Sequence, residues 1–237
     1  MTTPPVVTVD GPAGSGKTTL GRLLATRLRL PLVDTGLFYR GVMVASLWAA
    51  LDGTDPAAVT RVAAATSLEV NTDPEAPEDG WQLRVDGVDP GGLARDPQHA
   101  TLLATLSAIP GVRAAILDRQ RREARRGAVA VGRDCGTIVF PDAPVKLYLW
   151  ASADERARRR SRQLARSGTT VDEAGLAAEI AGRDERDIGR EVSPLRPAPD
   201  AHLIDTGAVG VEATLAEALA HCAEAGLDGA GPGGPNP

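Results

Sequence analysis

The residues most suited to chemistry form a glycine-rich segment, residues 11–19, near the start of the chain. This segment matches the pattern G-x-x-x-x-G-K-[ST], follows the apolar run 6–9 and precedes a stretch with apolar residues at helical spacing, 20–28. Strand, glycine loop and helix form the context of a phosphate-binding loop, in which main-chain N–H groups and the positive end of a helix face an anion. The segment consists of Gly11, Pro12, Ala13, Gly14, Ser15, Gly16, Lys17, Thr18 and Thr19. We predict that it binds the phosphates of a nucleoside triphosphate, with Lys17 reaching the outer phosphates and the Thr18 hydroxyl serving as a ligand of Mg²⁺.

Lysine usage supports this interpretation over that of an ordinary glycine turn. Only Lys17 and Lys146 are lysines among the 26 basic residues, and all the others are arginines. A compact ammonium group fits a phosphate cradle in a way that a forked guanidinium does not. A chain that otherwise uses arginine has a lysine at the one position where the loop requires it.

Two further groups of polar residues follow predicted strands. Asp34 and Thr35 end the second strand, and Arg40 comes one helical turn later, where it could face an anion. Arg133 and Asp134 directly follow a strand of small apolar residues. The alternatives are a helix with a surface arginine in the first case and a surface salt bridge in the second.

Arginines also recur at helical spacing in the last third of the chain. Arg183, Asp187 and Arg190 are spaced i, i+4 and i+7, and therefore share one helical face, which Arg186 joins. Arginines balance charge on a transferring phosphoryl group, although such a face could equally be solvated and carry helical ion pairs.

A second arginine-rich helix precedes that one. Arg156 and Arg160 share a face within a strongly basic run. This run would suit a helical lid that closes over a triphosphate, and a solvated basic helix is an equal alternative.

Composition excludes several functional classes. The net charge of −5 and the aromatic content of 3% argue against a nucleic-acid-binding protein. No apolar run is long enough to cross a membrane, and the N-terminus has no signal-peptide pattern. Cys135 and Cys222 lack metal-ligand spacing, which indicates a reducing compartment. We expect a cytoplasmic protein, and a monomer, because no uncovered apolar helix face is evident.

Strands and helices alternate along most of the chain. The predicted strands are 6–9, 31–34, 128–131, 145–150 and 202–206, and the predicted helices are 20–28, 36–50, 55–65, 97–106, 110–126, 152–167, 172–190 and 211–225. This order predicts an α/β fold in which a parallel sheet is covered by helices on both faces. Ligands bind such sheets at the carboxyl ends of the strands, where the candidate residues lie.

The domain organisation follows from the same pattern. We predict one phosphate-loop domain, 1–225, in which a region at about 35–125 would bind a second substrate, the acceptor of a transferred group, and arginine-rich helices at about 152–190 would form a lid. Short strands at 68–70 and 81–85 form a β-rich insertion, 68–95, in the acceptor-binding region. The Gly/Pro-rich segment 226–237 is expected to be a disordered tail.

Two absences narrow the chemistry. The strand 145–150 ends without an acidic residue, so there is no clear Walker-B aspartate for ATP-driven mechanical work, and no Asn-Lys-x-Asp motif for guanine occurs. A phosphate loop with several spaced arginines and a substrate-sized insertion favours phosphoryl transfer to a small molecule.

These motifs together resemble the bacterial cytidylate kinases, which belong to the nucleoside monophosphate kinase group. The shared segments are 10–17, 34–40, 110–113, 119–121, 132–143, 155–157, 183–184 and 186–187. The resemblance covers nearly the whole chain, and segment 132–143 is its most family-specific part. It implies transfer of the γ-phosphoryl group of ATP to CMP or dCMP with Mg²⁺.

The resemblance also implies a role for each matched residue. Thr35, Arg113 and Asp134 would read the cytosine edge, whereas Arg40, Arg133 and Arg190 would bind the phosphate of the acceptor. Arg183 and Asp187 would contact the pentose, and Arg156 and Arg160 would belong to the lid over ATP. Lys17, Arg133 and Arg190 would be the catalytic residues, since the reaction needs positioning and charge neutralisation.

Three alternatives stay open. Ala104 stands where the family usually has a serine, so the choice between CMP and dCMP is undetermined. The acceptor could be another molecule, such as UMP. A regulatory switch that binds ATP and acts through a partner is a third possibility, which the many acceptor-side arginines disfavour.

Overall fold

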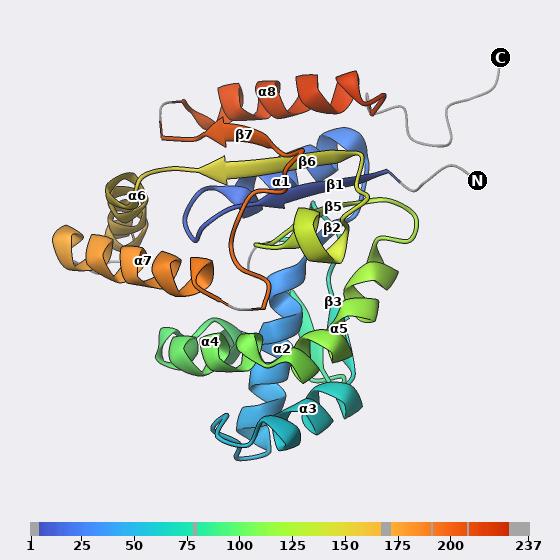
Figure 1. Cartoon of the computed structure of the whole chain (residues 1–237), viewed down its shortest axis with the longest axis vertical. Coiled ribbons are helices and arrows are strands. Elements are labelled where there is room, and N and C mark those ends of the chain that lie inside the picture. The colour runs from blue at the N-terminus through green and yellow to red at the C-terminus, as the bar shows by residue number, and fades with distance from the viewer. Residues whose placement is uncertain (1–4, 78–79, 167–171, 191, 208, 228–237) are drawn as a thin grey trace.

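A computed structural model describes residues 5–77, 80–166, 172–190, 192–207 and 209–227. Its centre is a five-stranded sheet with the order β2-β5-β1-β6-β7, in which every neighbouring pair is parallel. The strands are β1 (Val6–Asp10), β2 (Leu32–Asp34), β5 (Ala128–Val131), β6 (Val145–Trp150) and β7 (His202–Asp205). The predicted α/β class with a parallel sheet is confirmed (Figure 1).

Alternating residues of the central strands supply two separate cores. Val7 and Val9 of β1 pack with α1 (Lys17–Leu28) and α8 (Val211–Glu224) on one face. Val6 packs on the opposite face, with helices from the middle of the chain. Because both faces are covered, all five residues of β1 are buried, as expected of a parallel strand.

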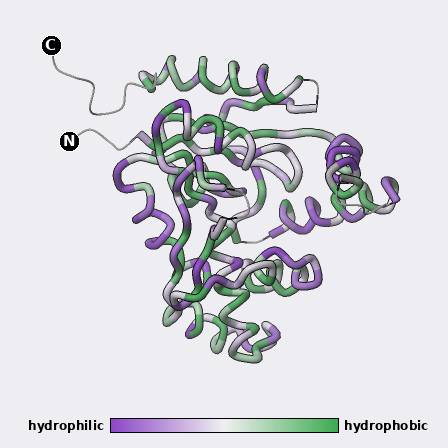
Figure 2. Tube along the Cα trace, turned by 180° about the vertical axis from the view of Figure 1, so that it is seen from behind, coloured by the Kyte–Doolittle hydropathy of each residue, from purple (hydrophilic) through white to green (hydrophobic). Residues whose placement is uncertain are grey.

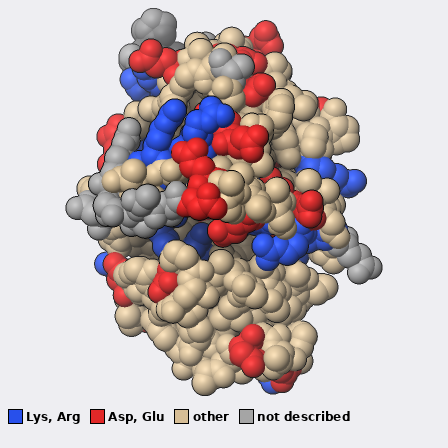
Figure 3. Space-filling model, turned by 90° about the vertical axis from the view of Figure 1, so that its left-hand side faces the viewer, with Lys and Arg blue, Asp and Glu red and all other residues tan. Residues whose placement is uncertain are grey.

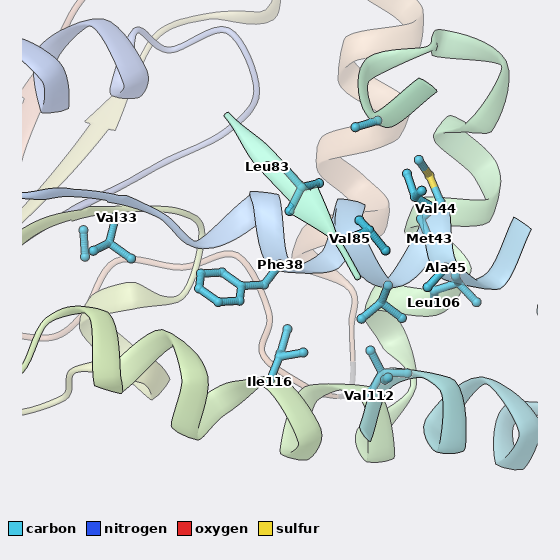
Figure 4. Close-up of a cluster of buried hydrophobic side chains, with 14 of the residues drawn as sticks. Val33, Phe38, Met43, Val44, Ala45, Leu83, Val85, Leu106, Val112 and Ile116 are labelled. Atoms are coloured by element: carbon cyan, nitrogen blue, oxygen red, sulfur yellow. The ribbon is translucent and has the colours of Figure 1, made fainter. Parts of the chain in front are cut away.

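The second core is built around α2 (Thr35–Trp48). This helix starts directly after β2 because the Asp34 carboxylate caps it by accepting from the Gly36 N–H at 2.9 Å. Phe38, Met43 and Val44 of α2 point into a cluster shared with β4 and α5 (Figure 4). The other helices of this lobe are α3 (Pro56–Ala65), α4 (Ala100–Ala108) and α5 (Pro110–Glu123).

The insertion is confirmed but contains little strand. β3 (Leu68–Val70) and β4 (Leu83–Val85) form a two-stranded antiparallel sheet, separate from the main one. Only the first part of the predicted insertion 68–95 is β-structure, because Gly91–Arg95 at its end is a 3₁₀ turn; a second 3₁₀ turn, Pro97–His99, follows it. The predicted helix 97–106 starts only at Ala100, because Asp96 caps the short turn that precedes it.

The two arginine-rich helices are α6 (Ala153–Arg166) and α7 (Glu173–Ile188), which pack against each other beside the sheet (Figure 1). Their starts follow the capping rules: Ser152 Oγ accepts from the Glu155 N–H at 3.2 Å, and Asp172 accepts from two N–H groups of α7. Hydrophilic residues dominate α6, which Figure 2 shows in purple.

An ordered turn follows the last helix, which ends at Glu224. The prediction of a disordered tail at 226–237 is wrong for the first two residues, 226 and 227. Gly226 takes a left-handed φ of 77°, and the Leu227 N–H donates to the Cys222 carbonyl at 2.8 Å, which closes α8 with a Schellman-type turn. Leu227 then packs on the first core. The rest of the predicted tail, 228–237, lies outside the described residues.

Within the described segments, no single helix has the length and apolar composition needed to cross a membrane. One pair of helical segments, Pro97–Ala108 and Pro110–Glu123, passes the same test together, but they are bent by 88° at their junction.

The core around α2 generates a test of the fold. Phe38 has 1% of its surface exposed, so Phe38→Ala should lower the free energy of unfolding by about 3–5 kcal/mol through lost burial and a residual cavity. Urea denaturation followed by circular dichroism measures this loss. Arg61→Ala, on the exposed side of α3, is the control and should stay within about 0.5 kcal/mol. Equal stability of the two variants would contradict the assigned core.

Candidate active site

The phosphate loop connects β1 to α1 at the carboxyl edge of the sheet. Gly14 and Gly16 have positive φ values of 79° and 91°, and Gly16 is the residue that precedes α1. Gly11, with φ of 145°, is needed for space as well, because a Cβ there would collide with the Leu149 carbonyl oxygen of β6. The loop therefore lies tightly on the sheet and leads its main-chain N–H groups to the helix N-terminus.

The Lys17 side chain is held by the main chain of the phosphate loop. Its Nζ donates to the Pro12 carbonyl oxygen at 2.5 Å, and its pKa falls to about 7, first because of burial and then because Arg133 is near. Asp10 and Asp34 act in the opposite direction and raise the Lys17 pKa. An anion at the loop would stabilise the charged form of this side chain.

The remaining polar side chains of the loop differ in exposure. Thr18 and Thr19 are exposed at the first turn of α1, whereas Ser15 is buried and its hydroxyl has no hydrogen-bond partner among the residues that the structure describes. No group of three or more His, Cys, Asp or Glu residues among the described ones could hold a metal ion. Proteins often bind Mg²⁺ through one or two of their own oxygens together with phosphates and waters, and the exposed Thr18 hydroxyl is of the type that can take part in this.

Arg156 joins the loop from α6. Its buried guanidinium donates to the Ala151 carbonyl at 2.9 Å and to the Ala13 carbonyl of the phosphate loop at 3.1 Å, and it forms an ion pair with Asp184 of α7. Arg160, one turn later on α6, is exposed. The structure thus brings Arg156 to the phosphate loop and leaves Arg160 on the surface of α6.

Arg113 and Asp134 form an ion pair between α5 and the loop after β5. The Arg113 guanidinium also donates to the Ser107 carbonyl at 2.9 Å and lies 5.2 Å from the centre of the Tyr39 ring. Three partners from different elements therefore orient one guanidinium beside one carboxylate. Such a pair presents donors and acceptors side by side, as recognition of a base edge requires.

Thr35 lies next to this pair and is buried. Its hydroxyl donates to the Val131 carbonyl at 2.9 Å and lies 3.6 Å from Cys135 Sγ, so its proton is already engaged and only acceptor capacity is left. The Gln120 side chain donates to the Thr35 carbonyl at 3.2 Å. Gly132 leaves room for this arrangement, since a Cβ there would collide with the Thr35 hydroxyl.

Asp187 is the carboxylate shared by two arginines. Its oxygens lie 2.5 Å from Arg133 Nε and 2.6 Å from Arg190 Nη2, and only 2% of the residue is exposed. Asp187 on α7 therefore faces Arg133 in the loop after β5, whereas Arg190 lies beyond the end of α7 at Ile188, so the predicted helical face ends before Arg190. The predicted participation of Arg186 in this face is wrong, because Arg186 is exposed and donates to the Gly182 carbonyl of its own helix.

Arg133 lies at the centre of a cluster of cations. Its charge contributes to lowering the pKa of Lys17, Arg40, Arg183 and Arg190, although burial is the larger cause in each case. These side chains come from α1, α2, α7 and the residues after α7 and all lie within electrostatic reach of Arg133. Arg40 also donates to the Ala94 carbonyl of the insertion at 2.6 Å. Several converging cations can hold more than one phosphate group.

Charged residues gather near this site and are sparse below it. Figure 3 shows Lys and Arg side chains interleaved with Asp and Glu over the upper part of the face near α6 and α7. The lower part of the same face carries few charges.

Three residues at this site could not be predicted from the spacing of residues in the sequence. Asp10 is a buried carboxylate at the end of β1 with a pKa raised to about 6 by burial, Asp184 pairs with Arg156, and Tyr39 lies against Arg113. All three belong to segments that carry the family resemblance, 10–17, 34–40 and 183–184, which was the only available signal. The partners of all three are far away in the sequence, so spacing could not reveal them.

The shared carboxylate generates a prediction about stability. Asp187→Ala should lower the free energy of unfolding by about 1–3 kcal/mol, because Arg133 and Arg190 would lose their counter-ion. Added sulfate should then raise the melting temperature of the variant more than that of the wild-type protein, by supplying the missing negative charge. Thermal unfolding with and without sulfate measures both effects.

Glu217→Ala is the matched control, since the pair between Glu217 and His202 is exposed. It should change stability by less than about 0.5 kcal/mol and show the same response to sulfate as the wild-type protein. An Asp187→Ala variant that behaves like this control would contradict the proposed charge balance.

Comparison with known proteins agrees with these observations. The sequence model of the cytidylate kinase family matches residues 7–224 of this chain. Cytidylate kinases from Pseudomonas paraeruginosa and from two strains of Pseudomonas aeruginosa are each 42% identical over 226 residues, which cover 94% of this chain and 97% of theirs. A solved structure of an uncharacterized protein from Eubacterium ventriosum covers 94% of this chain and 99% of its own, at 16% identity and a TM-score of 0.49. By the family match and the identity to these relatives, the chain belongs to the cytidylate kinase family.

Proposed function

We propose that this protein transfers the γ-phosphoryl group of ATP to CMP or dCMP, which yields ADP and CDP or dCDP. The observation that carries the proposal is the position of Arg133. It is in electrostatic reach of Lys17 at the phosphate loop and in contact with Asp187 on α7, and it adjoins Asp134, the partner of Arg113. A donor site and an acceptor site therefore meet at one residue.

The phosphate loop is the donor half of this site. Its N–H groups and Lys17 would hold the ATP phosphates, and Arg156, anchored on the Ala13 carbonyl, would lie over them. Mg²⁺, which the Thr18 hydroxyl would help to hold, would neutralise negative charge on the transferred phosphoryl group and on the leaving ADP.

Arg40, Arg133 and Arg190 would bind the acceptor phosphate. Asp187 already balances two of them, so an incoming phosphate would meet guanidinium groups that are oriented before binding. Arg183, whose pKa is lowered by burial and by Arg133, would lie with Asp187 near the pentose. Pre-oriented cations cost little reorganisation when charge develops.

Thr35, Arg113 and Asp134 would read the base. Cytosine presents an amino donor beside two acceptors, which suits a carboxylate acceptor and a guanidinium donor. Uracil has a carbonyl oxygen in place of that amino group, so in a closed site the acceptor capacity of Asp134 that Arg113 does not use would receive no proton from the base, at a cost of about 1–3 kcal/mol or more. This difference favours CMP over UMP as the acceptor.

No side chain has to act as a nucleophile or as a base. An oxygen of the acceptor phosphate attacks the γ-phosphorus of ATP, the bond from that phosphorus to the bridging oxygen breaks, and the electron pair leaves with ADP. The protein positions the two phosphates in line and neutralises their charge through Lys17, Arg133 and Arg190.

Some parts of the proposal go beyond the chemical step. Helices α6 and α7 would act as a lid over the nucleotides. Both cysteines are free and buried, which supports a reducing, cytoplasmic compartment. The substrates would be small nucleotides with no nucleic acid or membrane involved, and the protein would work as a monomer.

Asp134→Ala tests the base-reading assignment. With ATP and a panel of nucleoside monophosphates, the wild-type protein should turn over CMP and dCMP better than UMP, AMP or GMP. Asp134→Ala should lower kcat/KM for CMP by about 10- to 100-fold and change that for UMP much less, because only cytosine loses a partner. A coupled assay for ADP measures these rates.

Asp142→Ala is the control, since Asp142 is exposed on the same segment. It should leave the preference for CMP unchanged. Better turnover of another monophosphate by the wild-type protein would show that the acceptor is wrong, and a nucleotide that is bound without turnover would favour a regulatory switch.

Thr18 provides a test of the metal. Chelation of divalent cations should abolish turnover, and excess Mg²⁺ should restore it. Thr18→Val should lower kcat/KM for ATP by about tenfold or more, as expected from a lost interaction of about 1.4 kcal/mol, whereas Thr18→Ser keeps the hydroxyl and should stay close to wild type. Identical behaviour of Thr18→Val and Thr18→Ser would rule out Thr18 as a ligand.

A further inference from the structure

Asp10 is a buried carboxylate to which neither the family match nor the proposed chemistry assigns a role. It is the last residue of β1, immediately before the phosphate loop, and 5% of its surface is exposed. Burial penalises the charged form of such a group, so a carboxylate at this depth depends on the contacts that stabilise its charge.

The hydrogen bonds of Asp10 lead to the acceptor side of the site. Its Oδ1 accepts from the Cys135 N–H at 2.9 Å and its Oδ2 accepts from the Gly136 N–H at 2.7 Å. These two residues directly follow Arg133 and Asp134 and begin a single turn of π-helix, Cys135–Val139. The carboxylate thus holds two consecutive N–H groups at the start of a helical turn, where negative charge is favoured.

Close packing makes this attachment specific. The Gly132 N–H donates to the Val9 carbonyl at 3.1 Å, so the segment is bound to β1 on both sides of Arg133 and Asp134. A Cβ at Gly136 would lie 2.9 Å from Thr8 Oγ1 and 3.4 Å from Asp10 Oδ2, so only glycine lets this N–H approach without displacing a neighbour.

Asp10 is also close to the donor side, because it directly precedes the phosphate loop in the chain. It is among the charges that favour the protonated form of Lys17. One side chain is therefore in contact with the segment that carries Arg133 and Asp134 and in electrostatic reach of the loop lysine.

We infer that Asp10 is a positioning residue that couples the phosphate loop to the acceptor-binding segment. By holding the N–H groups of Cys135 and Gly136, it places Arg133 and Asp134 in register with Lys17, so that acceptor and donor phosphates meet in line. This role rests on the proposed function of Arg133 and Asp134 and adds the residue through which they are positioned.

Asp10→Asn tests the inference, because an amide has one acceptor oxygen and would turn its NH₂ group toward the second N–H. The KM for CMP should rise about 10- to 100-fold, as expected for the loss of a charge-assisted hydrogen bond, while the KM for ATP should change less than about threefold. The ratio of kcat/KM for CMP to that for UMP should fall, which a general loss of stability would not cause.

Thr8→Val is the matched control. Thr8 lies in the same strand, is fully buried, and its hydroxyl has no partner, so this variant alters the neighbourhood of Gly136 without touching the carboxylate. It should keep both KM values and the preference for CMP. If Asp10→Asn does not fold, Gly136→Ala disturbs the same attachment with the carboxylate in place and should show the same selective rise in the KM for CMP.

The double variant Asp10→Asn/Asp134→Ala separates this inference from the proposed function. If Asp10 acts through Asp134, the double variant should discriminate between CMP and UMP no worse than Asp134→Ala alone. An unchanged KM for CMP in Asp10→Asn, an equal rise in the KM for ATP, or the same effect in Thr8→Val would overturn the inference. If instead Asp134→Ala left the preference for CMP intact, the base-reading proposal itself would fail.

Discussion

The structure depends on keeping several cations close together at one edge of a sheet. Lys17, Arg40, Arg183 and Arg190 all lie in the field of Arg133, and burial makes their mutual repulsion costlier. Buried carboxylates offset this repulsion, with Asp187 between two arginines and Asp134 on Arg113. This cluster of positive charge must be balanced by carboxylates within the protein, and it is also suited to attract two phosphate groups. The requirements of charge balance and of phosphate binding therefore favour the same arrangement of side chains.

The parallel sheet makes that arrangement possible. The ends of β1, β2 and β5 are neighbours, and they bring together the phosphate loop, the start of α2 and the segment after Val131. Two cores on opposite faces hold these strands in place, so the polar residues that follow them need not contribute to the core. Asp10 lies where these segments meet and contacts the one that carries Arg133 and Asp134.

Most of the elements could be predicted from hydrophobic periodicity, and the failures have local causes. The helix predicted at 97–106 begins as a 3₁₀ turn, Pro97–His99, capped by Asp96, before α4 starts at Ala100. The order of Leu227 depends on a turn and a core that lie outside its own segment. Arg186 matches the helical spacing of its neighbours but is exposed. Helical spacing shows which residues lie on neighbouring parts of the helix surface, but it does not show which part is covered by the rest of the protein.

The sequence by itself determined the phosphate loop motif and the alternation of strands and helices that favours a parallel sheet, because both are read from residues close together in the chain. The roles expected of the acceptor-side arginines came from the family resemblance. Only the tertiary structure decided which charges pair. Asp10 binds Cys135 across 125 positions, and Arg156 binds Asp184 across 28. Such pairings depend on the distance between the groups in space and on their burial, because burial strengthens the interaction between two charges. The local spacing of residues encodes neither of them.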